Sequence, residues 1–434
     1  MLYEALISIG ILVVLLSFGV PLAFCFAGAL MYLTTFSDVA TMKSTMVWGF
    51  SQLGNPVLLC IPLFVFAGNL MSSSGIADAL LRFMDLFVGR IRGGLGAVAV
   101  ITCGVIGAIS GSGLTGVAAV GGLLIPRMEA AGYPRGYSTA LVASSSILGL
   151  LIPPSISMII FGWVTETSIL ACFLATLVPG VLLMAVFIAI NYVCARHFDV
   201  ARGESIPLER IFREAKERTM KATPALMMPI IILGGIYGGV MTPTEAAAVA
   251  CLYSIPVGLY VYKGLNQRKI VFAGKDSVTA VGSIMVMILF SLILSQQFVF
   301  GGVPQDMAEA IFSITSNEIC LLLLVNVLLF IVGMMVNDVT GIILLAPLLL
   351  PLLKQIGVDP VHFAAIMGVN LGMGLLTPPY ASVLYFSMRV GDATFVQVVR
   401  PLGLFLLLGY LPMCLLVTFY EPLSMALPRL LGYA

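Results

Sequence analysis

Residues 149–154 read Gly-Leu-Leu-Ile-Pro-Pro, and residues 374–379 read Gly-Leu-Leu-Thr-Pro-Pro. These stretches belong to a longer internal repeat, in which residues 106–154 align without gaps on residues 331–379. Matches of glycine, proline and threonine carry the alignment, because leucine matches are common by chance in an apolar chain. The sequence therefore contains a duplicated unit of about fifty residues.

The composition of the chain is typical of a membrane protein. Of its 434 residues, 60% are hydrophobic and 9% are charged, and the mean hydropathy is +1.11. Apolar runs of roughly 20 residues, long enough to cross a hydrocarbon core of about 30 Å, follow one another closely. The runs do not alternate as barrel strands do, and in lipid every backbone group needs an internal partner. We therefore predict an all-α polytopic membrane protein. The net charge of +1 gives no indication of an acidic partner, and we expect no nucleic-acid partner.

The expected topology has about nine full spans and two re-entrant helical hairpins, or about eleven membrane segments. The full spans are 6–35, 46–72, 136–163, 168–195, 222–240, 243–262, 277–300, 360–388 and 401–420. The hairpins are the interrupted apolar stretches 94–128 and 318–353. With a cytoplasmic N-terminus and a periplasmic C-terminus, all of the 21 Lys and Arg residues except Lys43, Lys354 and Arg429 fall on the cytoplasmic side, as the positive-inside rule requires.

The repeat organises the chain into five segments. Each copy contributes a hairpin and the broken helix that follows it. An odd number of predicted spans separates the copies, so the second is inverted, as in many secondary transporters. The segments are 1–93, the first hairpin with its broken helix at 94–163, 164–317 with an amphipathic linker at 196–221, the second hairpin with its broken helix at 318–390, and a C-terminal span at 391–434.

The hairpin tips are the first candidate site. The first tip reads Ser110-Gly-Ser112-Gly and the second reads Asn337-Asp338. Each tip starts a half-helix, whose free N–H groups and positive dipole end suit an anion. Alternatively, Ser112, Asn337 or Asp338 only caps the following helix. An acid at membrane depth is costly, so Asp338 is the best single functional candidate.

The proline breaks are the second candidate site. Proline lacks an N–H and frees the carbonyl four residues earlier, so Pro153 frees that of Gly149 and Pro378 frees that of Gly374. Backbone, serine and threonine oxygens are suitable ligands for a hard cation such as Na⁺, although a plain proline kink is the alternative. A proton relay normally needs more buried acids or histidines, so Na⁺ coupling is favoured and proton coupling stays open as the alternative.

Signatures of an enzyme are missing from the sequence. The two histidines, His197 and His362, belong to no His-Glu-x-x-His motif, and no Walker A loop occurs. The sequence around Ser110 lacks the leading glycine of a Gly-x-Ser-Gly motif. We therefore expect no enzyme and no metal site other than one for Na⁺. A channel is also less favoured, because channels usually gain symmetry by oligomerising whereas this chain carries its own inverted pair.

Several of these motifs resemble those of a known family. The runs Gly-Ala-Ile-Ser-Gly-Ser-Gly at 107–113, Leu-Ile-Pro at 124–126 and Gly-Leu-Leu-Ile-Pro-Pro-Ser at 149–155 are similar to the large membrane (M, DctM-like) subunit of tripartite ATP-independent periplasmic (TRAP) transporters. So are Pro-Leu-Phe at 62–64 and Thr-Pro-Thr-Glu-Ala-Ala at 242–247. The resemblance covers almost the whole chain.

This resemblance implies an importer in the bacterial inner membrane. Its substrate would be a small organic anion, such as sialic acid or a C4-dicarboxylate, with Na⁺ as the coupling ion and no cofactor. Its partners would be a periplasmic substrate-binding protein and a small four-span membrane subunit. The implied fold is of the elevator type. In it, a transport domain of half 1 (94–163) and half 2 (318–390) slides against a scaffold made of a first segment with a connecting arm (1–93) and a second segment (164–317).

The resemblance also implies the site residues. The first Na⁺ site would use Ser110, Gly149, Ile152 and Pro154. Its mirror would use Asp338, Gly374, Thr377 and Pro379. The anion would lie near Ser112, Asn337 and Asp338. Because an acid repels an anionic substrate, we expect Asp338 to serve the ion site first.

Overall fold

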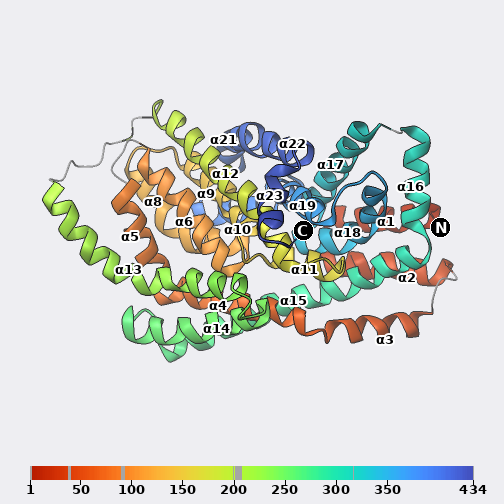
Figure 1. The fold of residues 1–434 in the computed structure, drawn as a ribbon, viewed down its shortest axis with the longest axis horizontal. Helices are drawn as coiled ribbons and strands as arrows, with labels where there is room; N and C mark the ends of the chain where they lie inside the picture. The colour runs from red at the N-terminus through yellow and green to blue at the C-terminus, as the bar shows by residue number, and fades with distance from the viewer. Residues whose placement is uncertain are drawn as a thin grey trace.

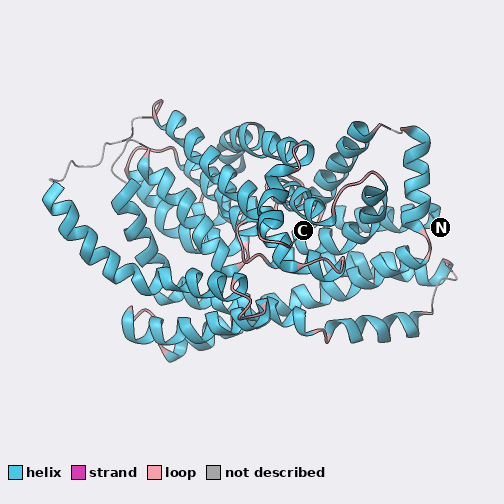
Figure 2. Cartoon of the chain, viewed as in Figure 1, coloured by secondary structure: helices cyan, strands magenta, loops and turns pink. Residues whose placement is uncertain are grey.

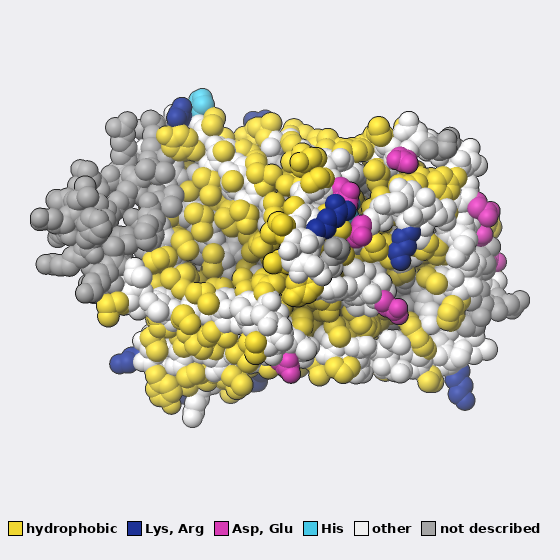
Figure 3. Space-filling model, in the orientation of Figure 1, with side chains coloured by type: hydrophobic (Ala, Val, Ile, Leu, Met, Phe, Trp, Pro, Cys, Tyr) yellow, Lys and Arg dark blue, Asp and Glu magenta, His cyan; other side chains and the backbone are white. Residues whose placement is uncertain are grey.

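The computed structural model describes residues 2–37, 41–88, 93–198, 200, 208–315 and 317–433. These residues form helices joined by turns, and no strand occurs among them (Figure 2). Eight helices are long and apolar enough to cross a bilayer, or nine if the bent pair Arg135–Leu151 and Ile156–Val164 is one span. Hydrophobic side chains are spread over much of the face seen in Figure 3, and charged side chains are few there. The all-helical prediction is confirmed, while the predicted number of spans stays a prediction.

One group of helices, which we call the scaffold body, surrounds the long helix α15. Its members are α1 (Leu2–Ser17), α2 (Leu22–Phe36), α3 (Met42–Leu53), α4 (Cys60–Ser74), α5 (Ile76–Val88), α13 (Leu208–Tyr237), α14 (Pro243–Pro256), α15 (Gln267–Phe300) and α16 (Val303–Ile314). Helix α15 packs against α2, α3 and α4, and α14 packs against α4 and α13 (Figure 1).

The second group, which we call the repeat body, contains both copies of the duplicated unit. The first copy forms α6 (Gly94–Ser110), α7 (Gly113–Gly116), α8 (Gly122–Ala130), α9 (Arg135–Ser146), α10 (Leu148–Leu151) and α11 (Ile156–Val164). The second forms α17 (Glu318–Met335), α18 (Asp338–Gln355), α19 (Pro360–Gly374) and α20 (Ser382–Gly391). Both predicted hairpins and both broken helices are therefore present. The copies pack directly on each other, α11 against α18 and α9 against α20.

Further helices pack on the repeat body. They are α12 (Ile169–Ala195), α21 (Phe395–Phe405), α22 (Leu411–Phe419) and α23 (Pro422–Leu430). Helix α12 packs against α6, α11 and α19, α21 packs against α9, and α22 packs against α19. These helices therefore pack with the repeat body, and the predicted segment boundaries stay predictions.

The predicted span 6–35 is wrong. This segment forms two helices, α1 and α2, that fold back on each other. Helix α1 ends because Gly19 takes a left-handed φ of +77° and Pro21 follows it, so the helix cannot continue. The predicted span 46–72 is also interrupted, since Asn55 accepts a hydrogen bond from the Val57 N–H and starts a new turn between α3 and α4.

The N-terminus lies far from the start of α13. Figure 1 shows the N-terminus at the same end of the molecule as α16 and the start of α3, whereas α13 starts at the opposite end. The amphipathic linker 196–221, only part of which lies within the described residues, leads into α13. The predicted cytoplasmic N-terminus stays a prediction. The linker's last residues and the predicted span 222–240 form one continuous helix.

Candidate functional site

The first hairpin tip is closed by its own backbone. Helix α6 ends at Ser110, and Gly111 takes a φ of +63°, a conformation that favours glycine. The buried Ser110 hydroxyl lies 3.3 Å from the carbonyl oxygens of Gly107 and Ser112, to which it donates. Ser112 makes no side-chain capping bond to α7. The alternative that Ser112 only caps the following helix is therefore not supported.

The second tip combines a cap with a contact between the repeats. The Asn337 side-chain oxygen accepts a hydrogen bond from the Thr340 N–H at 3.0 Å, so capping does explain this residue. The Asp338 carboxylate instead accepts a hydrogen bond from the Ser157 hydroxyl of α11. Because Ser157 belongs to the first copy and Asp338 to the second, this contact joins the two copies at the tip.

The proline breaks follow one plan in both copies. Each contains a cis peptide bond, Pro153-Pro154 or Pro378-Pro379. The glycine that precedes each break touches a glycine of the hairpin: a Cβ built on Gly149 would lie 2.4 Å from the Gly107 Cα. A Cβ built on Gly374 would lie 2.3 Å from the Gly333 carbonyl carbon. At each break, the backbone of the helix therefore touches the backbone of the hairpin. A residue with a Cβ would clash there, so only glycine fits.

The expectation of free carbonyls is only partly met. The Gly374 carbonyl accepts a hydrogen bond from the Thr377 N–H at 2.9 Å, so the break does not leave it unpartnered. The turn tightens here to a three-residue spacing, which replaces the bond that Pro378 cannot donate. The Thr377 hydroxyl donates to the Met373 carbonyl at 3.0 Å, and the Tyr380 N–H donates to the Met334 carbonyl of α17 at 3.0 Å.

The two tips meet at one cavity of about 170 Å³. The three predicted substrate residues, Ser112, Asn337 and Asp338, all line it. Helices of the scaffold body close it with Ile61, Val65 and Ile284. Sequence reasoning missed these apolar residues, because nothing in an apolar run marks which face meets a distant tip. It also missed Tyr380 and Ser382, which line the cavity from the second break.

The predicted ion-site residues lie around the same tips. In the first copy, Gly149 contacts the helix that ends at Ser110, and a Cβ on Gly111 would lie 3.2 Å from the Pro154 carbonyl oxygen. Ile152 instead contacts α6 and α12, beside Gly104 and Gly180. In the second copy, Asp338 starts the half-helix and Gly374, Thr377 and Pro379 form the break.

One unsatisfied oxygen fits a bound cation. The Thr340 hydroxyl is fully buried in the first turn of α18 and has no hydrogen-bond partner among the described residues. A buried polar atom without a partner is costly, so such an atom in the turn that Asp338 starts calls for a ligand or water. Thr340 is not among the site residues predicted from the sequence. Its position in a Thr-Gly pair that occurs in both copies is the signal that could have identified it.

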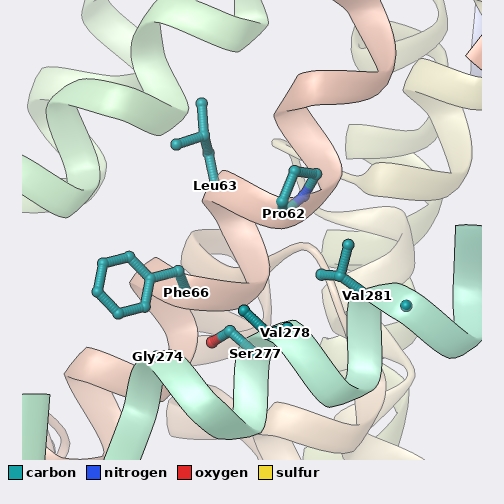
Figure 4. A pocket seen from close by; sticks show the side chains of 8 residues that line it. Pro62, Leu63, Phe66, Gly274, Ser277, Val278 and Val281 are labelled. Atoms are coloured by element: carbon teal, nitrogen blue, oxygen red, sulfur yellow. The ribbon is translucent and has the colours of Figure 1, made fainter. Parts of the chain in front are cut away.

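A larger apolar hollow of about 490 Å³ lies elsewhere, between α4 and α15. Figure 4 shows Leu63, Phe66 and Val281 on its walls. Its lining residues include no charged side chain. A carboxylate could not be bound there without a costly unpaired charge, so the tip cavity remains the candidate substrate site.

Comparisons with known proteins agree with this arrangement. The family model described as "Tripartite ATP-independent periplasmic transporter, DctM component" matches residues 9–423. The chain is 35% identical over 412 residues to the C4-dicarboxylate TRAP transporter large permease protein DctM of Pseudomonas aeruginosa, covering 94% of this chain and 93% of that protein. It is 36% identical over 428 residues to the sialic acid TRAP transporter large permease protein SiaM of Vibrio cholerae, covering 96% and 97%.

A solved structure shares the fold. The YdaH transporter of Alcanivorax borkumensis superposes with a TM-score of 0.59 at 16% sequence identity, covering 88% of this chain and 89% of that one. The likeness at this identity concerns the fold alone, whereas the family match spans nearly the full sequence. The chain therefore belongs to the DctM component family of tripartite ATP-independent periplasmic transporters.

Proposed function

We propose that this chain is the membrane permease of a Na⁺-coupled importer for a small organic anion, such as sialic acid or a C4-dicarboxylate. One observation carries the proposal: the tips of two repeated hairpins line the same cavity. Ile284, on the scaffold side of that cavity, lies near the middle of α15 (Gln267–Phe300), as expected for a site at the membrane midplane.

The anion would bind where α18 starts. The N-terminal end of a helix stabilises a negative charge by roughly 0.3–1 kcal/mol. The Asp338 carboxylate opposes this, because two like charges at about 4 Å repel by about 4 kcal/mol at an effective dielectric constant of ~20. A Na⁺ ion between the carboxylates turns this repulsion into attraction, so the substrate and the ion would bind together.

The two Na⁺ ions would lie at the repeated breaks. We assign Ser110, Gly149, Ile152 and Pro154 to the first site, mostly through backbone oxygens. We assign Asp338, Gly374, Thr377 and Pro379 to the second. The unpartnered Thr340 hydroxyl supports an ion at the second site. No other cofactor is required.

The repeat body would carry the site across the membrane by sliding as an elevator against the scaffold body. The two bodies meet mainly through α15 and α16 against α18, and through α5 and α4 against α6. A Cβ built on Gly68 of α4 would lie 2.9 Å from the Ser110 Cβ, so the tip passes close to the scaffold. Apolar, closely packed surfaces of this kind can shift between discrete arrangements.

The partners follow from the tripartite family. We propose a small four-span membrane subunit and a periplasmic substrate-binding protein, in the bacterial inner membrane. The cytoplasmic N-terminus and the periplasmic C-terminus predicted from the positive-inside rule are kept in this proposal.

Proton coupling is the second candidate. It rests on Asp338, the one acid among the lining residues of the tip cavity, which could bind a proton in place of Na⁺. A carboxylate that must release its proton would make uptake follow a pH gradient instead of a Na⁺ gradient. A channel remains the third alternative.

Reconstitution separates these candidates. The chain and its small partner are placed in liposomes, and uptake of labelled sialic acid or succinate is measured with the cognate binding protein outside. We expect uptake to require both an inward Na⁺ gradient and one binding protein. Uptake that follows only a pH gradient would assign the coupling to a proton, and flux without a binding protein or an ion gradient would indicate a channel.

A further inference from the structure

A second cavity lies at the boundary of the two bodies, and the function proposed above does not use it. Its volume is about 540 Å³, several times that of the tip cavity. Its polar and aromatic lining residues are Trp48, Gln52, Asn55, Trp163, Glu166, Ser295, Gln296 and Phe300. The sequence contains two tryptophans, and both line this cavity. We call it the tryptophan cavity.

The tryptophan cavity and the tip cavity share one wall. Ile284 of α15 lines the tip cavity, and Ser295 and Gln296 of the same helix line the tryptophan cavity. A separation of eleven or twelve residues corresponds to about 17 Å along a helix. From the tip cavity, the tryptophan cavity lies toward the C-terminal end of α15. This end of α15 is at the end of the molecule opposite the start of α13 (Figure 1).

Both bodies contribute to the tryptophan cavity. Trp48 and Gln52 belong to α3 of the scaffold body, whereas Trp163 belongs to α11 and Pro347 to α18 of the repeat body. If the repeat body slides along α15, the tips move toward this cavity or away from it. A solute held here would therefore stand on the path between the predicted periplasmic side and the tips.

The lining defines the chemistry of the solute. The side chains of Gln52 and Gln296 make no hydrogen bond within the described part of the chain and can pair with hydroxyl groups. Indole rings pack against the C–H faces of a ring or chain. The lining includes the Glu166 carboxylate and no lysine or arginine. Glu166 repels a monoanion less strongly than a dianion. A monoanion with many hydroxyl groups can offset this repulsion by hydrogen bonds to the two glutamine amides, whereas an unhydroxylated dianion cannot.

We propose that the tryptophan cavity binds a polyhydroxylated organic acid on its way to the tips and selects this class over unhydroxylated dicarboxylates. The role of this binding in transport rests on the function proposed above. The binding itself depends only on the residues that line the cavity.

Tryptophan fluorescence tests the proposal directly, because both tryptophans of the chain line the cavity. The full chain in lipid nanodiscs is titrated with gluconate, N-acetylneuraminate and succinate. We expect a saturable change with at least one of the two hydroxylated acids and none with succinate. Trp48→Phe and Trp163→Phe should each remove part of the change.

Two further variants locate the binding. Gln296→Leu should raise the half-saturating concentration at least tenfold, while the control Gln267→Leu, the same substitution at the other end of α15, should leave it unchanged. Asp338→Asn should keep the fluorescence change, because it alters only the tip cavity. A change that disappears in Asp338→Asn would assign the signal to the tips and overturn the proposal.

The outcomes separate this proposal from the transport function. Na⁺-dependent uptake of a hydroxylated acid without any fluorescence change would contradict binding in the tryptophan cavity. It would leave the proposed transport function unaffected. An equal fluorescence response to succinate would also contradict selective binding in the tryptophan cavity. The same holds if the Gln296→Leu variant binds the acid as tightly as the unaltered chain does. A fluorescence change of the expected kind without uptake would overturn the transport function alone.

Discussion

At the scale of single residues, the contact between Ser157 and Asp338 is the most informative one in the site. It joins the first copy to the second at the only tip that carries an acid. The hydroxyl holds the carboxylate in one orientation, which is what an ion ligand requires. The function of these two side chains can be tested separately, because one carries the charge and the other positions it.

Asp338→Asn should abolish the Na⁺ dependence of uptake. The amide keeps the shape of the side chain and removes the charge that we assign to the ion. We expect uptake to fall at least about tenfold, equivalent to about 1.4 kcal/mol, in proteoliposomes with a Na⁺ gradient. The matched control is Glu309→Gln, an exposed acid on α16. Full Na⁺ dependence in the Asp338 variant would remove this residue from the ion site.

Ser157→Ala should raise the half-saturating Na⁺ concentration by about tenfold or more, since a hydrogen bond to a charged group contributes roughly 1.5–3 kcal/mol. Ser157→Thr, which keeps the hydroxyl, should recover most of the affinity. Ser283→Ala, an exposed serine on α15, serves as the control. An alanine variant with unchanged Na⁺ affinity and unchanged uptake would show that the contact is only structural.

At the scale of the helices, the two copies show how a broken helix is fixed in place. Each break is seated against its hairpin by a pair of glycines, Gly149 with Gly107 and Gly374 with Gly333. The atoms opposite are backbone atoms, which cannot rotate away as a side chain can. The repeat therefore constrains the shape of each half as well as its chemistry.

Gly149→Ala and Gly374→Ala should each destabilise the protein by about 1–3 kcal/mol, the usual cost of forcing an added methyl group into a packed interior. Gly403→Ala is the control, because a Cβ there meets nothing within 4 Å and alanine favours the helix. Thermal unfolding of the purified variants measures the effect. Equal melting temperatures for all three variants would contradict the proposed backbone contacts.

At the scale of the whole molecule, the central expectation is movement of the repeat body past the scaffold body. Gly68 of α4 and Thr115 of the first tip face each other across that boundary, and a Cβ on Gly68 would lie 3.2 Å from the Thr115 Cγ2. Asn69 and Ser277, by contrast, are both in the scaffold body and are hydrogen-bonded at 2.9 Å.

Cross-linking Gly68→Cys to Thr115→Cys with Hg²⁺ should stop uptake, and excess thiol should restore it. The exposed Cys320 is replaced by serine in all variants. The pair Asn69→Cys and Ser277→Cys bridges helices of one body, so its cross-link should leave uptake intact. Each single cysteine tests whether the substitution alone disturbs the tip. Undiminished uptake by the cross-linked boundary pair would rule out sliding at this contact.

The sequence by itself determined the helical class, the internal repeat, the two hairpins and the position of both tips. These follow from local signals: long apolar runs have one solution in lipid, and glycine, proline and polar residues interrupt a helix wherever they occur. The same local rule, applied to Gly19 and Pro21, should have divided the first predicted span into two helices.

Only the tertiary structure decided which residues meet across the molecule. Ser157 reaches Asp338, Ile284 closes the tip cavity, and Trp48 shares a cavity with Trp163. These pairs are far apart in the sequence, and each lies in a run whose apolar pattern is satisfied equally well by lipid or by protein. Hydropathy therefore cannot tell which face of a membrane helix meets another helix, because both environments are equally apolar.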